Sequence, residues 1–587
     1  MMVVIIDNKL PSSPSPPPPP PTRTLSTITS ISMISLNNNN NDNDKWTKST
    51  YNRRLKCPFR FIIALMGIIA SILLCSTRYN VSIAIVSMVK DLASTTTSNS
   101  YCHRIDPDYP NRLESLFRSS SSSSSLLLLQ SSNDTTISQE VTWTDLEQGI
   151  ILGAYYYGYA ATHIFGGRWS ERYGPKWITA IGLIGAAILN AFLPIGSNFF
   201  VFASLRVLIG CFHGVVEPAL FFMFKKWFPP NEQTIALSLL LIGNALGLIL
   251  NVPISAAITH IPLPSSIPDW SLLFFGGSAL HLIWLVLWII LVTDMPENHR
   301  RISDKEIFYI RQNSHNVLET NLRTVPWRRI LKTKALYASI MAKLCWSFNH
   351  AIIIDNGPSF LNKIFNFNML KASEHIALIY TVTVVVFIFS AFLFAKLDKC
   401  TKCSHTRLRK LFQAIVFIGA SATMFAMANS GCNLHLLEIF IIINMVTQGF
   451  TSVGEYPMIN EFAGYYSGTV YGITITFDSL ARALAPLIRC ELVSQTDLKA
   501  NWVIIFYITA VLNLIGLIVF ELFASTTPKQ WALKRDLVRM ISSTNNGHIE
   551  RPVKKELKLE LQNPNYRQDI DTETDDWRQF KTSTLVQ

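Results

Sequence analysis

Long apolar stretches alternate with short polar segments from about residue 60 to residue 525. A helix rises about 1.5 Å per residue, so about 20 apolar residues cross the hydrocarbon core of a bilayer. Each such stretch is expected to be a helix, because backbone groups in lipid must bond within their own segment. Twelve stretches qualify, at 61–89, 148–166, 175–196, 200–224, 234–259, 270–293, 335–355, 373–396, 410–428, 434–456, 466–490 and 501–524.

Composition and charge placement support a membrane protein with many spans. Of 587 residues, 49% are apolar and only 15% are charged, which is too apolar for an ordinary soluble protein. The formal net charge of +12 could indicate a protein that binds nucleic acid, but the placement of the charge argues against it, because the Lys and Arg residues gather in alternate loops. They precede the first stretch and follow the second, fourth, sixth and eighth, whereas 197–199, 260–269 and 429–433 carry none. The positive-inside bias therefore predicts that both termini are cytosolic, although the turn at 457–465, which also lacks Lys and Arg, departs from the pattern.

The same pattern divides the chain into five regions. We expect a disordered cytosolic tail at 1–58, a first six-helix half at 59–294, a central cytosolic loop at 295–334, a second six-helix half at 335–524 and a cytosolic tail at 525–587. Loop 91–147 of the first half contains the sequon Asn133-Asp-Thr135, so Asn133 is expected to be glycosylated on the non-cytosolic side. Two six-helix halves joined by a cytosolic loop are typical of transporters built from repeats.

Catalytic and metal-binding patterns are weak along the chain. No nucleophile triad, nucleotide-binding loop or metal cluster is evident in the sequence, which argues against an enzyme and against a cofactor. Cys400 and Cys403 with His405 offer half of a zinc site, but that loop contains no second pair. A reduced cysteine pair without a role is the preferred interpretation.

The fourth stretch contains three ionisable residues, Arg206, His213 and Glu217, in an apolar context. Their spacing places them on one face of a helix. Ionisable groups inside a membrane are costly, and they normally face a water-filled pathway or a partner. Arg206 and Glu217 lie about 16 Å apart along a helix axis, so direct pairing between them is not expected.

The turn after the second stretch reads GGRWSERYGPK from Gly166 to Lys176 and resembles the loop signature of the major facilitator superfamily. We expect its residues to form a cytosolic gate that opens and closes as the two halves move. The gate prediction comprises Gly167, Glu171, Arg172, Gly174 and Lys176. The alternative is that the charged residues only fix the orientation in the membrane.

A narrower resemblance covers most of the membrane region. It is carried by Ser76-Thr-Arg-Tyr-Asn-Val-Ser82, by Gln148–Tyr159, by Arg206–Gly210 with Lys226-Trp-Phe-Pro-Pro-Asn-Glu232, and by Phe523-Ala-Ser525. These segments resemble the anion:cation symporter family, which includes sialin, the vesicular glutamate transporters and the sodium–phosphate cotransporters. The resemblance implies a twelve-helix all-α major facilitator fold and an anionic substrate. It also implies that Arg78 and Arg206, together with Tyr156, bind that substrate, and the planar guanidinium of arginine suits a carboxylate or phosphate.

Two departures from the family concern proton coupling and substrate. His213 stands where vesicular members carry a coupling glutamate. Protonation makes a glutamate neutral, whereas it would make His213 positive. Glu217, one turn further, offers the acidic role, while a neutral His213 that is hydrogen-bonded within the bundle is the alternative. Leu152 and Trp346 replace a histidine and an arginine of the glutamate transporters, which makes glutamate a doubtful substrate.

The second half contains a further set of polar residues inside the predicted spans. One helical face carries Lys343, Trp346 and His350. This face offers a positive charge in place of the arginine that Trp346 replaces, unless Lys343 extends toward the cytosol. Asp478 and Arg482 have i, i+4 spacing, so either they satisfy each other or Asp478 takes part in coupling.

Together these features predict a secondary active transporter of an organic or inorganic anion, working by alternating access and coupled to protons. Two alternatives are a sodium-dependent phosphate cotransporter and a transport-dead receptor or scaffold. We expect the protein to function as a monomer in the plasma membrane or in a lysosomal or vesicular membrane. The sequence leaves the anion and the coupling ion open.

Overall fold

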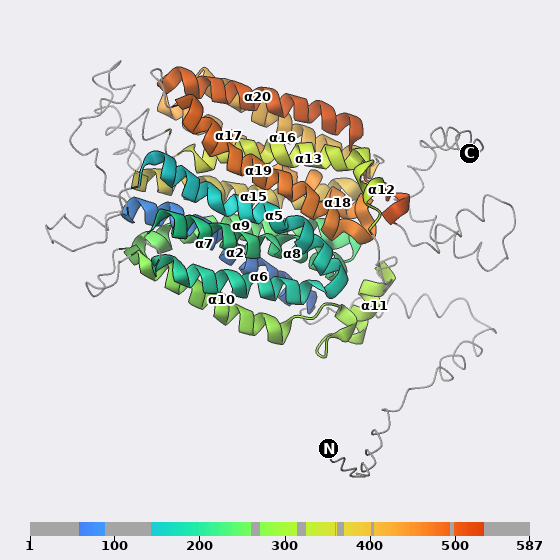
Figure 1. Ribbon diagram of the computed structural model, residues 1–587. Coiled ribbons are helices and arrows are strands. Elements are labelled where there is room, and N and C mark those ends of the chain that lie inside the picture. The colour runs from blue at the N-terminus through green and yellow to red at the C-terminus, as the bar shows by residue number, and fades with distance from the viewer. Residues whose placement is uncertain are drawn as a thin grey trace, which may run out of the picture. The chain divides into compact units, whose positions relative to one another are not determined.

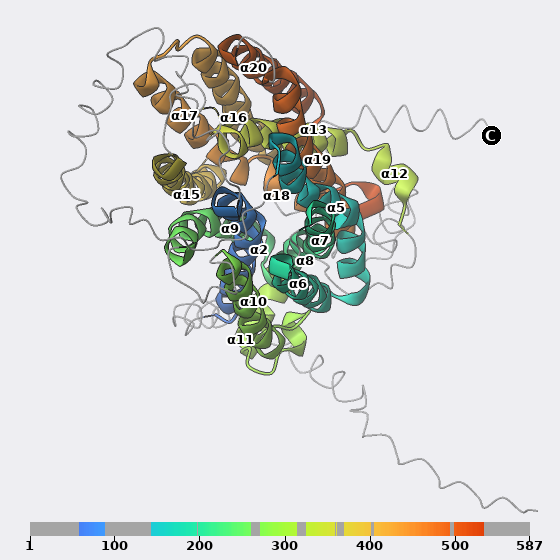
Figure 2. The same ribbon diagram turned by 60° about the vertical axis from the view of Figure 1, so that its left-hand side comes forward.

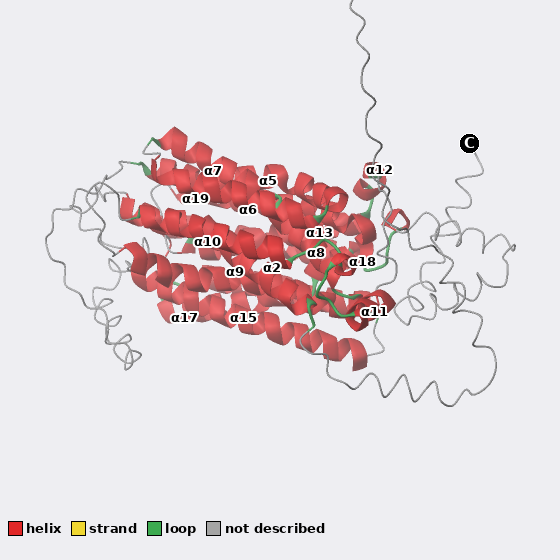
Figure 3. Ribbon diagram, turned by 90° about the horizontal axis from the view of Figure 1, so that it is seen from below, coloured by secondary structure: helices red, strands yellow, loops and turns green. Residues whose placement is uncertain are grey.

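The computed structural model describes residues 58–88, 143–195, 198–259, 270–313, 325–357, 360, 369–400, 404–493 and 498–532. Most of both predicted tails and most of loop 91–147, including Asn133, lie outside the described residues. Within the described ranges all regular structure is helical (Figure 3).

The described helices match the twelve predicted stretches (Figure 1). The first half contains α2 (Arg60–Met88), α5 (Asp145–Tyr173), α6 (Pro175–Phe192) with η2 (Leu193–Ile195), α7 (Phe199–Gly214) with α8 (Val216–Trp227), α9 (Pro230–Thr259) and α10 (Ser271–Leu291). The second half contains α13 (Lys334–His350) with η4 (Ala351–Asp355), α15 (Met369–Cys400), α16 (His405–Ala428), α17 (Leu434–Gly449), α19 (Ser467–Val493) and α20 (Leu498–Phe523). The central segment adds α11 (Asp304–Asn313) and α12 (Trp327–Leu331).

Hydropathy alone identifies fewer spans than the arrangement of the helices. Nine stretches of the described residues are long and apolar enough to cross a membrane, and one of them, Leu434–Arg489, contains both α17 and α19. The helices α5 and α13 are not among the nine. The helix α5 packs between α7 and α19, and α13 packs against α19 and α20, so their polar side chains are covered by protein.

Two local features differ from uninterrupted spans. The fourth span breaks at Val215, between α7 and α8. The tenth ends at Gly449 instead of continuing to 456, and the next turn contains η5 (Phe450–Ser452), α18 (Glu455–Ala463) and η6 (Gly464–Tyr466). Most of α18 is buried. Lys and Arg would be desolvated there, which explains why this turn departs from the charge pattern.

The two halves meet along helices that are distant in sequence. The helix α5 packs against α19, and α9 packs against α15 (Figure 2). On the outer faces of α10 and α20, large apolar side chains such as Ile283, Ile290, Ile518 and Leu522 are exposed, which suits contact with lipid.

Glycines allow α5 and α7 to approach each other closely. A Cβ atom at Gly158 would lie 1.9 Å from the carbonyl oxygen of Val207, and one at Gly210 would lie 2.1 Å from that of Tyr155. Close backbone approach through small residues is a common way in which membrane helices pack. This contact sets the distance between the helices that carry Tyr155, Tyr159 and Arg206.

Gly158→Ala is expected to destabilise the protein because its methyl group would meet backbone that cannot move aside. Overpacking of this kind costs about 1–3 kcal/mol. A matched control is Gly276→Ala on α10, whose added Cβ meets nothing within 4 Å. Thermal unfolding of the purified protein should give a lower Tm for Gly158→Ala and an unchanged or slightly higher Tm for Gly276→Ala. Equal Tm values for the two variants would contradict the packing described here.

Candidate functional site

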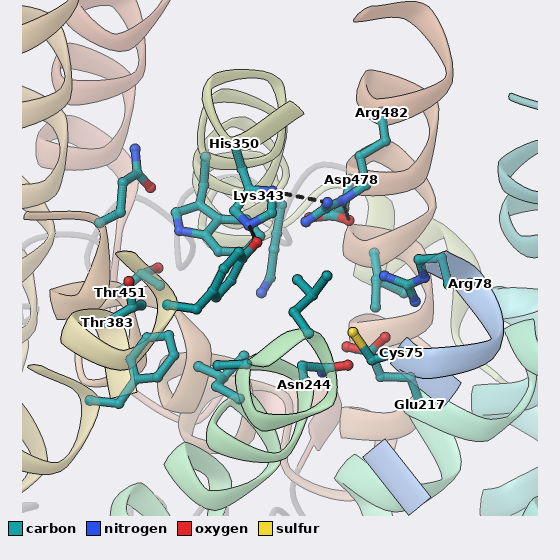
Figure 4. Close-up of a pocket in the computed structure, with 18 of the residues that line it drawn as sticks. Cys75, Arg78, Glu217, Asn244, Lys343, His350, Thr383, Thr451, Asp478 and Arg482 are labelled. Carbon is teal, nitrogen blue, oxygen red and sulfur yellow. Dashed lines mark hydrogen bonds and ion pairs between the residues drawn. The ribbon is translucent and has the colours of Figure 1, made fainter. Parts of the chain in front are cut away.

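A cavity of about 870 Å³ lies between the two halves. Its walls come from α2, α5, α8 and α9 of the first half and from α13, α15, α17 and α19 of the second. Apolar and neutral polar side chains form much of the lining, and several charged side chains point into the same space (Figure 4).

Arg78 on α2 lines this cavity, and tyrosines of α5 surround it. Its guanidinium carbon lies 4.8 Å from the ring centre of Tyr159, 5.5 Å from that of Tyr155 and 5.9 Å from that of Tyr156. Cation–π contacts of this kind compensate a positive charge in part without neutralising it. The Nε and Nη2 atoms of Arg78 are buried and have no hydrogen-bond partner, and no ion pair involves Arg78 among the described residues.

Arg206 lies behind Arg78 and does not line the cavity. It is 1% exposed and donates from Nη1 to the carbonyl oxygen of Thr77 at 3.4 Å and from Nη2 to that of Arg78 at 3.2 Å. Its guanidinium carbon lies 5.0 Å from the ring centre of Tyr155. In this arrangement Arg206 holds the backbone that carries Arg78. Tyr156, the third predicted binding residue, also lies outside the lining and contacts Arg78 from one side.

The break at Val215 separates His213 from Glu217. His213 is fully buried outside the cavity lining, and its Nδ1 lies 3.1 Å from the hydroxyl of Tyr155. Its ring stacks on that of His281 from α10, with ring centres 5.9 Å apart. His281 could not be predicted from the sequence, because nothing in its local pattern pointed to α7.

Glu217 lines the cavity and connects the two halves. Tyr159 of the first half donates its hydroxyl to Oε2 at 2.6 Å, and Tyr471 of the second half donates to Oε1 at 2.7 Å. Both carboxylate oxygens are therefore acceptors from tyrosines that stand on opposite sides of the interface.

Lys343 on α13 is paired within the second half. Its Nζ lies 3.3 Å from Oε2 of Glu455, and the pair is buried. The ammonium also lies 4.5 Å from the ring centre of Tyr456 and 5.6 Å from that of Tyr471. Lys343 therefore lines the cavity, and its charge is compensated there by Glu455.

Arg482 on α19 also has its charge compensated. Its Nε donates to Oδ2 of Asp478 at 3.2 Å, and its Nη1 lies 3.1 Å from Nδ1 of His350. The other ring nitrogen of His350 lies 2.6 Å from the hydroxyl of Tyr380, and the ring of Trp346 lies 5.4 Å from the guanidinium carbon. The i, i+4 pair thus satisfies itself, and all five predicted residues of the second half line the cavity.

The predicted gate residues lie where α5 and α6 meet the second half. Glu171 accepts hydrogen bonds from the backbone N–H and the hydroxyl of Thr469 on α19, both at 2.6 Å. A Cβ atom at Gly167 would lie 2.1 Å from the carbonyl oxygen of Gly468, so this position has room only for glycine. Arg172 is exposed and contacts the ring of Tyr173.

Gly174 and Lys176 shape the turn between α5 and α6. Gly174 has a φ of 96°, which L side chains rarely adopt. The backbone N–H of Lys176 donates to Oδ1 of Asp294 at 2.8 Å. These two residues act within the first half.

Two further contacts between the halves were not predicted. Lys225 on α8 donates from Nζ to the carbonyl oxygens of Asn460 and Gly464. Arg409 on α16 donates to the hydroxyl of Thr234 on α9 at 2.9 Å. In the sequence Lys225 and Arg409 are ordinary basic residues at span ends, so no local signal distinguishes them from residues that only fix orientation.

Comparisons with known proteins place this geometry in a family. Residues 67–486 match the model of the Major Facilitator Superfamily. Human sialin is 29% identical over 81% of this chain and 91% of its own length. A putative inorganic phosphate cotransporter of Drosophila melanogaster is 23% identical over 68% and 76%, and vesicular glutamate transporter 3 of Danio rerio is 24% identical over 67% and 66%.

Solved structures share the fold at low sequence identity. The proton:xylose symporter XylE matches with a TM-score of 0.59 and 12% identity over 80% of this chain and 97% of its own. The human organic anion transporter MFSD10 matches with a TM-score of 0.51 and 12% identity over 78% and 98%. With the family model covering most of the membrane region and the helices arranged as described, the chain belongs to the Major Facilitator Superfamily.

Proposed function

We propose that this protein is a secondary active transporter that carries a small anionic solute by alternating access and couples that movement to protons. The observation that carries the proposal is Arg78, a cation in the cavity between the halves that contacts tyrosine rings and no carboxylate within the described part of the chain. The family consists of transporters and not of enzymes. The similar proteins named for sialin, for vesicular glutamate transport and for inorganic phosphate cotransport support an anion as the solute.

Arg78 is suited to bind the anion because its charge is incompletely compensated. A carboxylate or phosphate would accept two parallel hydrogen bonds from the guanidinium, whose buried Nε and Nη2 atoms have no partner. Arg206 supports this role through its bonds to the carbonyl oxygens of Thr77 and Arg78, and Tyr156 supports it through its ring. Lys343 and Arg482 are less suited, since each already has an acidic partner.

Glu217 is suited to couple a proton to the movement of the halves. As a carboxylate it accepts hydrogen bonds from Tyr159 and Tyr471. When protonated, one oxygen becomes a hydroxyl that must donate its own hydrogen, so one tyrosine bond must weaken or reverse. Protonation therefore changes a contact that joins the halves. His213 contributes through Tyr155, to which it is hydrogen-bonded. A positive charge on a protonated His213 would also repel Arg78 and Arg206.

Charge placement and one cysteine support the proposed orientation in the membrane. Cys432, in the turn between α16 and α17, is disulfide-bonded. Disulfides form in oxidising compartments, which supports a non-cytosolic position for this turn and cytosolic termini. Glu171, Gly167, Lys225 and Arg409 then hold the halves together on the cytosolic side, with the protein acting as a monomer in a plasma, lysosomal or vesicular membrane.

Arg78→Gln is expected to abolish uptake of the transported anion, because the amide keeps polarity but removes the charge. The assay is uptake of labelled phosphate, glucuronate, sialate, aspartate and glutamate into proteoliposomes under an imposed proton, sodium or voltage gradient. Arg301→Gln, at an exposed position outside the cavity, is the matched control and should transport normally.

Three results of this assay would contradict the proposal. Uptake of an anion that survives Arg78→Gln would remove Arg78 from the binding site. Uptake driven by sodium and indifferent to pH would favour sodium-dependent phosphate cotransport. Absence of flux for every anion, from protein shown to be folded, would favour a transport-dead receptor.

Glu217→Gln is expected to uncouple transport from protons. The amide cannot be protonated in the same range, and its NH₂ group cannot accept the bond from one of the two tyrosines. Uphill accumulation under a proton gradient should fall at least tenfold, while exchange of labelled for unlabelled anion continues. Tyr471→Phe, which leaves the carboxylate in place, should keep proton-driven uptake measurable. Unchanged accumulation by Glu217→Gln would exclude Glu217 as the coupling group.

Glu171→Gln should weaken closure on the cytosolic side, since the amide accepts from Thr469 through one oxygen instead of two. Labelling from the cytosolic side of a cysteine placed in the cavity, at Asn244→Cys, measures how often that side opens. The rate should rise severalfold in Glu171→Gln. Arg172→Gln should label at the wild-type rate, because the contact that Arg172 makes in the described structure is with Tyr173 of its own helix. Faster labelling of Arg172→Gln would show that Arg172 also takes part in the gate.

A further inference from the structure

His163 on α5 is a buried histidine that the proposed anion site and Glu217 do not involve. Its exposed fraction is 0%, and it lies outside the cavity lining. Its Nδ1 lies 2.8 Å from the carbonyl oxygen of Gly214 in the first half, and its Nε2 lies 2.9 Å from the hydroxyl of Ser479 in the second. One imidazole ring thus connects the break in the fourth span to the opposite half.

Pro218 explains why the Gly214 carbonyl needs a partner. In a continuous helix that carbonyl would accept from the backbone N–H four residues later, but residue 218 is proline and has no N–H. A carbonyl without a partner is costly inside a membrane, and His163 supplies the missing donor. Because a carbonyl can only accept, Nδ1 of His163 must carry a hydrogen.

This assignment determines what Ser479 does in each protonation state. In the neutral ring Nε2 has no hydrogen, so the Ser479 hydroxyl donates to it across the interface. In the protonated ring Nε2 donates, and the Ser479 hydroxyl must turn to its other acceptor, the carbonyl oxygen of Ile475 at 3.0 Å. The direction of the hydrogen bond between the halves therefore depends on the proton.

The surroundings of His163 disfavour a positive charge while the halves are closed. The ring of Tyr159 lies 4.2 Å away, and Glu217 on α8 is engaged by two tyrosines. Asp478 on α19 attracts a positive charge, but it is already paired with Arg482. Arg78 on α2 repels a second positive charge. No carboxylate of the described residues contacts the ring, so a proton bound there would be buried without a counter-charge.

We propose that His163 is a proton-binding site at the interface between the halves and that it links cytosolic pH to closure of the cytosolic side. The neutral ring accepts the Ser479 bond in the closed arrangement, whereas the protonated ring is more stable when the halves separate and water reaches it. His163 lies ten residues before Tyr173, about 15 Å from the end of α5 at the proposed cytosolic side. Since the closed arrangement binds the proton more weakly, acid shifts the equilibrium toward separation and alkali toward closure. The inference rests on the proposed function only in requiring that the two halves move apart.

The test measures the distance between spin labels on the two halves as pH is varied. Labels at Tyr173→Cys on α5 and Arg407→Cys on α16, in full-length protein whose other reactive cysteines are replaced by serine, occupy exposed positions. One linked proton changes the ratio of closed to separated molecules by up to about tenfold per pH unit. We expect the separated fraction to rise between about pH 8 and pH 5.5, a range that brackets the ordinary titration of histidine.

His163→Gln is the main variant because glutamine keeps a donor for Gly214 and an acceptor for Ser479 but does not take up a proton. In a Glu217→Gln background, which removes the other proton-dependent contact between the halves, it should lose most of the pH dependence and stay closed in acid. His281→Gln, a buried histidine away from the second half, is the matched control and should keep the wild-type dependence. If His163→Gln does not fold, Ser479→Ala provides the test: it removes the bond between the halves and should raise the separated fraction most at alkaline pH.

Two results would overturn the inference: wild-type distances that are indifferent to pH, or a His163→Gln protein that retains the wild-type pH dependence. If Ser479→Ala is used instead, a distribution of spin-label distances equal to that of the wild type at alkaline pH would also overturn the inference. The distances require neither substrate nor flux. pH-dependent distances without uptake of any anion would therefore contradict the proposed function alone, and uptake with pH-independent distances would contradict this inference alone.

Discussion

The structure depends on how positive charge is compensated inside a membrane. Water is scarce there, so each buried cation needs a carboxylate, a set of acceptors or an aromatic face. Lys343 and Arg482 have carboxylates, and Arg206 has backbone carbonyls and a ring. Among these four cations only Arg78 relies on tyrosine faces, and two of its buried nitrogen atoms have no hydrogen-bond acceptor. The incomplete compensation is what makes the cavity suitable for an anion.

The same tyrosines connect the binding position to the interface between the halves. The ring of Tyr159 lies against Arg78, and its hydroxyl donates to Glu217. Glu217 accepts in turn from Tyr471, whose ring lies near Lys343. An anion at Arg78 and a proton at Glu217 would therefore act on one continuous set of contacts. Coupling of this kind needs no long pathway, because the two sites share a side chain.

Much of the fold was predictable because span length and loop charge are imposed by the bilayer. All twelve predicted stretches correspond to described helices, including α5 and α13, which a hydropathy threshold omits. Arg78, Glu217 and Glu171 were also proposed from the sequence. The family resemblance implied Arg78, and an isolated charge in an apolar segment and a loop signature pointed to the other two. The position of Arg206 behind Arg78 was not predicted, because it is set by the carbonyl oxygens of Thr77 and Arg78 on α2 and not by a pattern within the fourth span.

The residues that were missed act through partners distant in sequence. His163 matters because Gly214 lacks its usual donor and because Ser479 stands opposite, and only the packed structure brings these three together. One local signal was present, since a proline at 218 in an apolar span leaves the carbonyl of residue 214 without a partner. His281 gave no such signal.

The most direct test of the central claim is a cryo-EM structure of the protein in nanodiscs with a bound anion that it transports. The account predicts density for the acidic group within hydrogen-bonding distance, about 3 Å, of the Arg78 guanidinium, between that residue and the second half. Density for the acidic group at Lys343 or Arg482, with the Arg78 guanidinium contacting only the tyrosines, would contradict it.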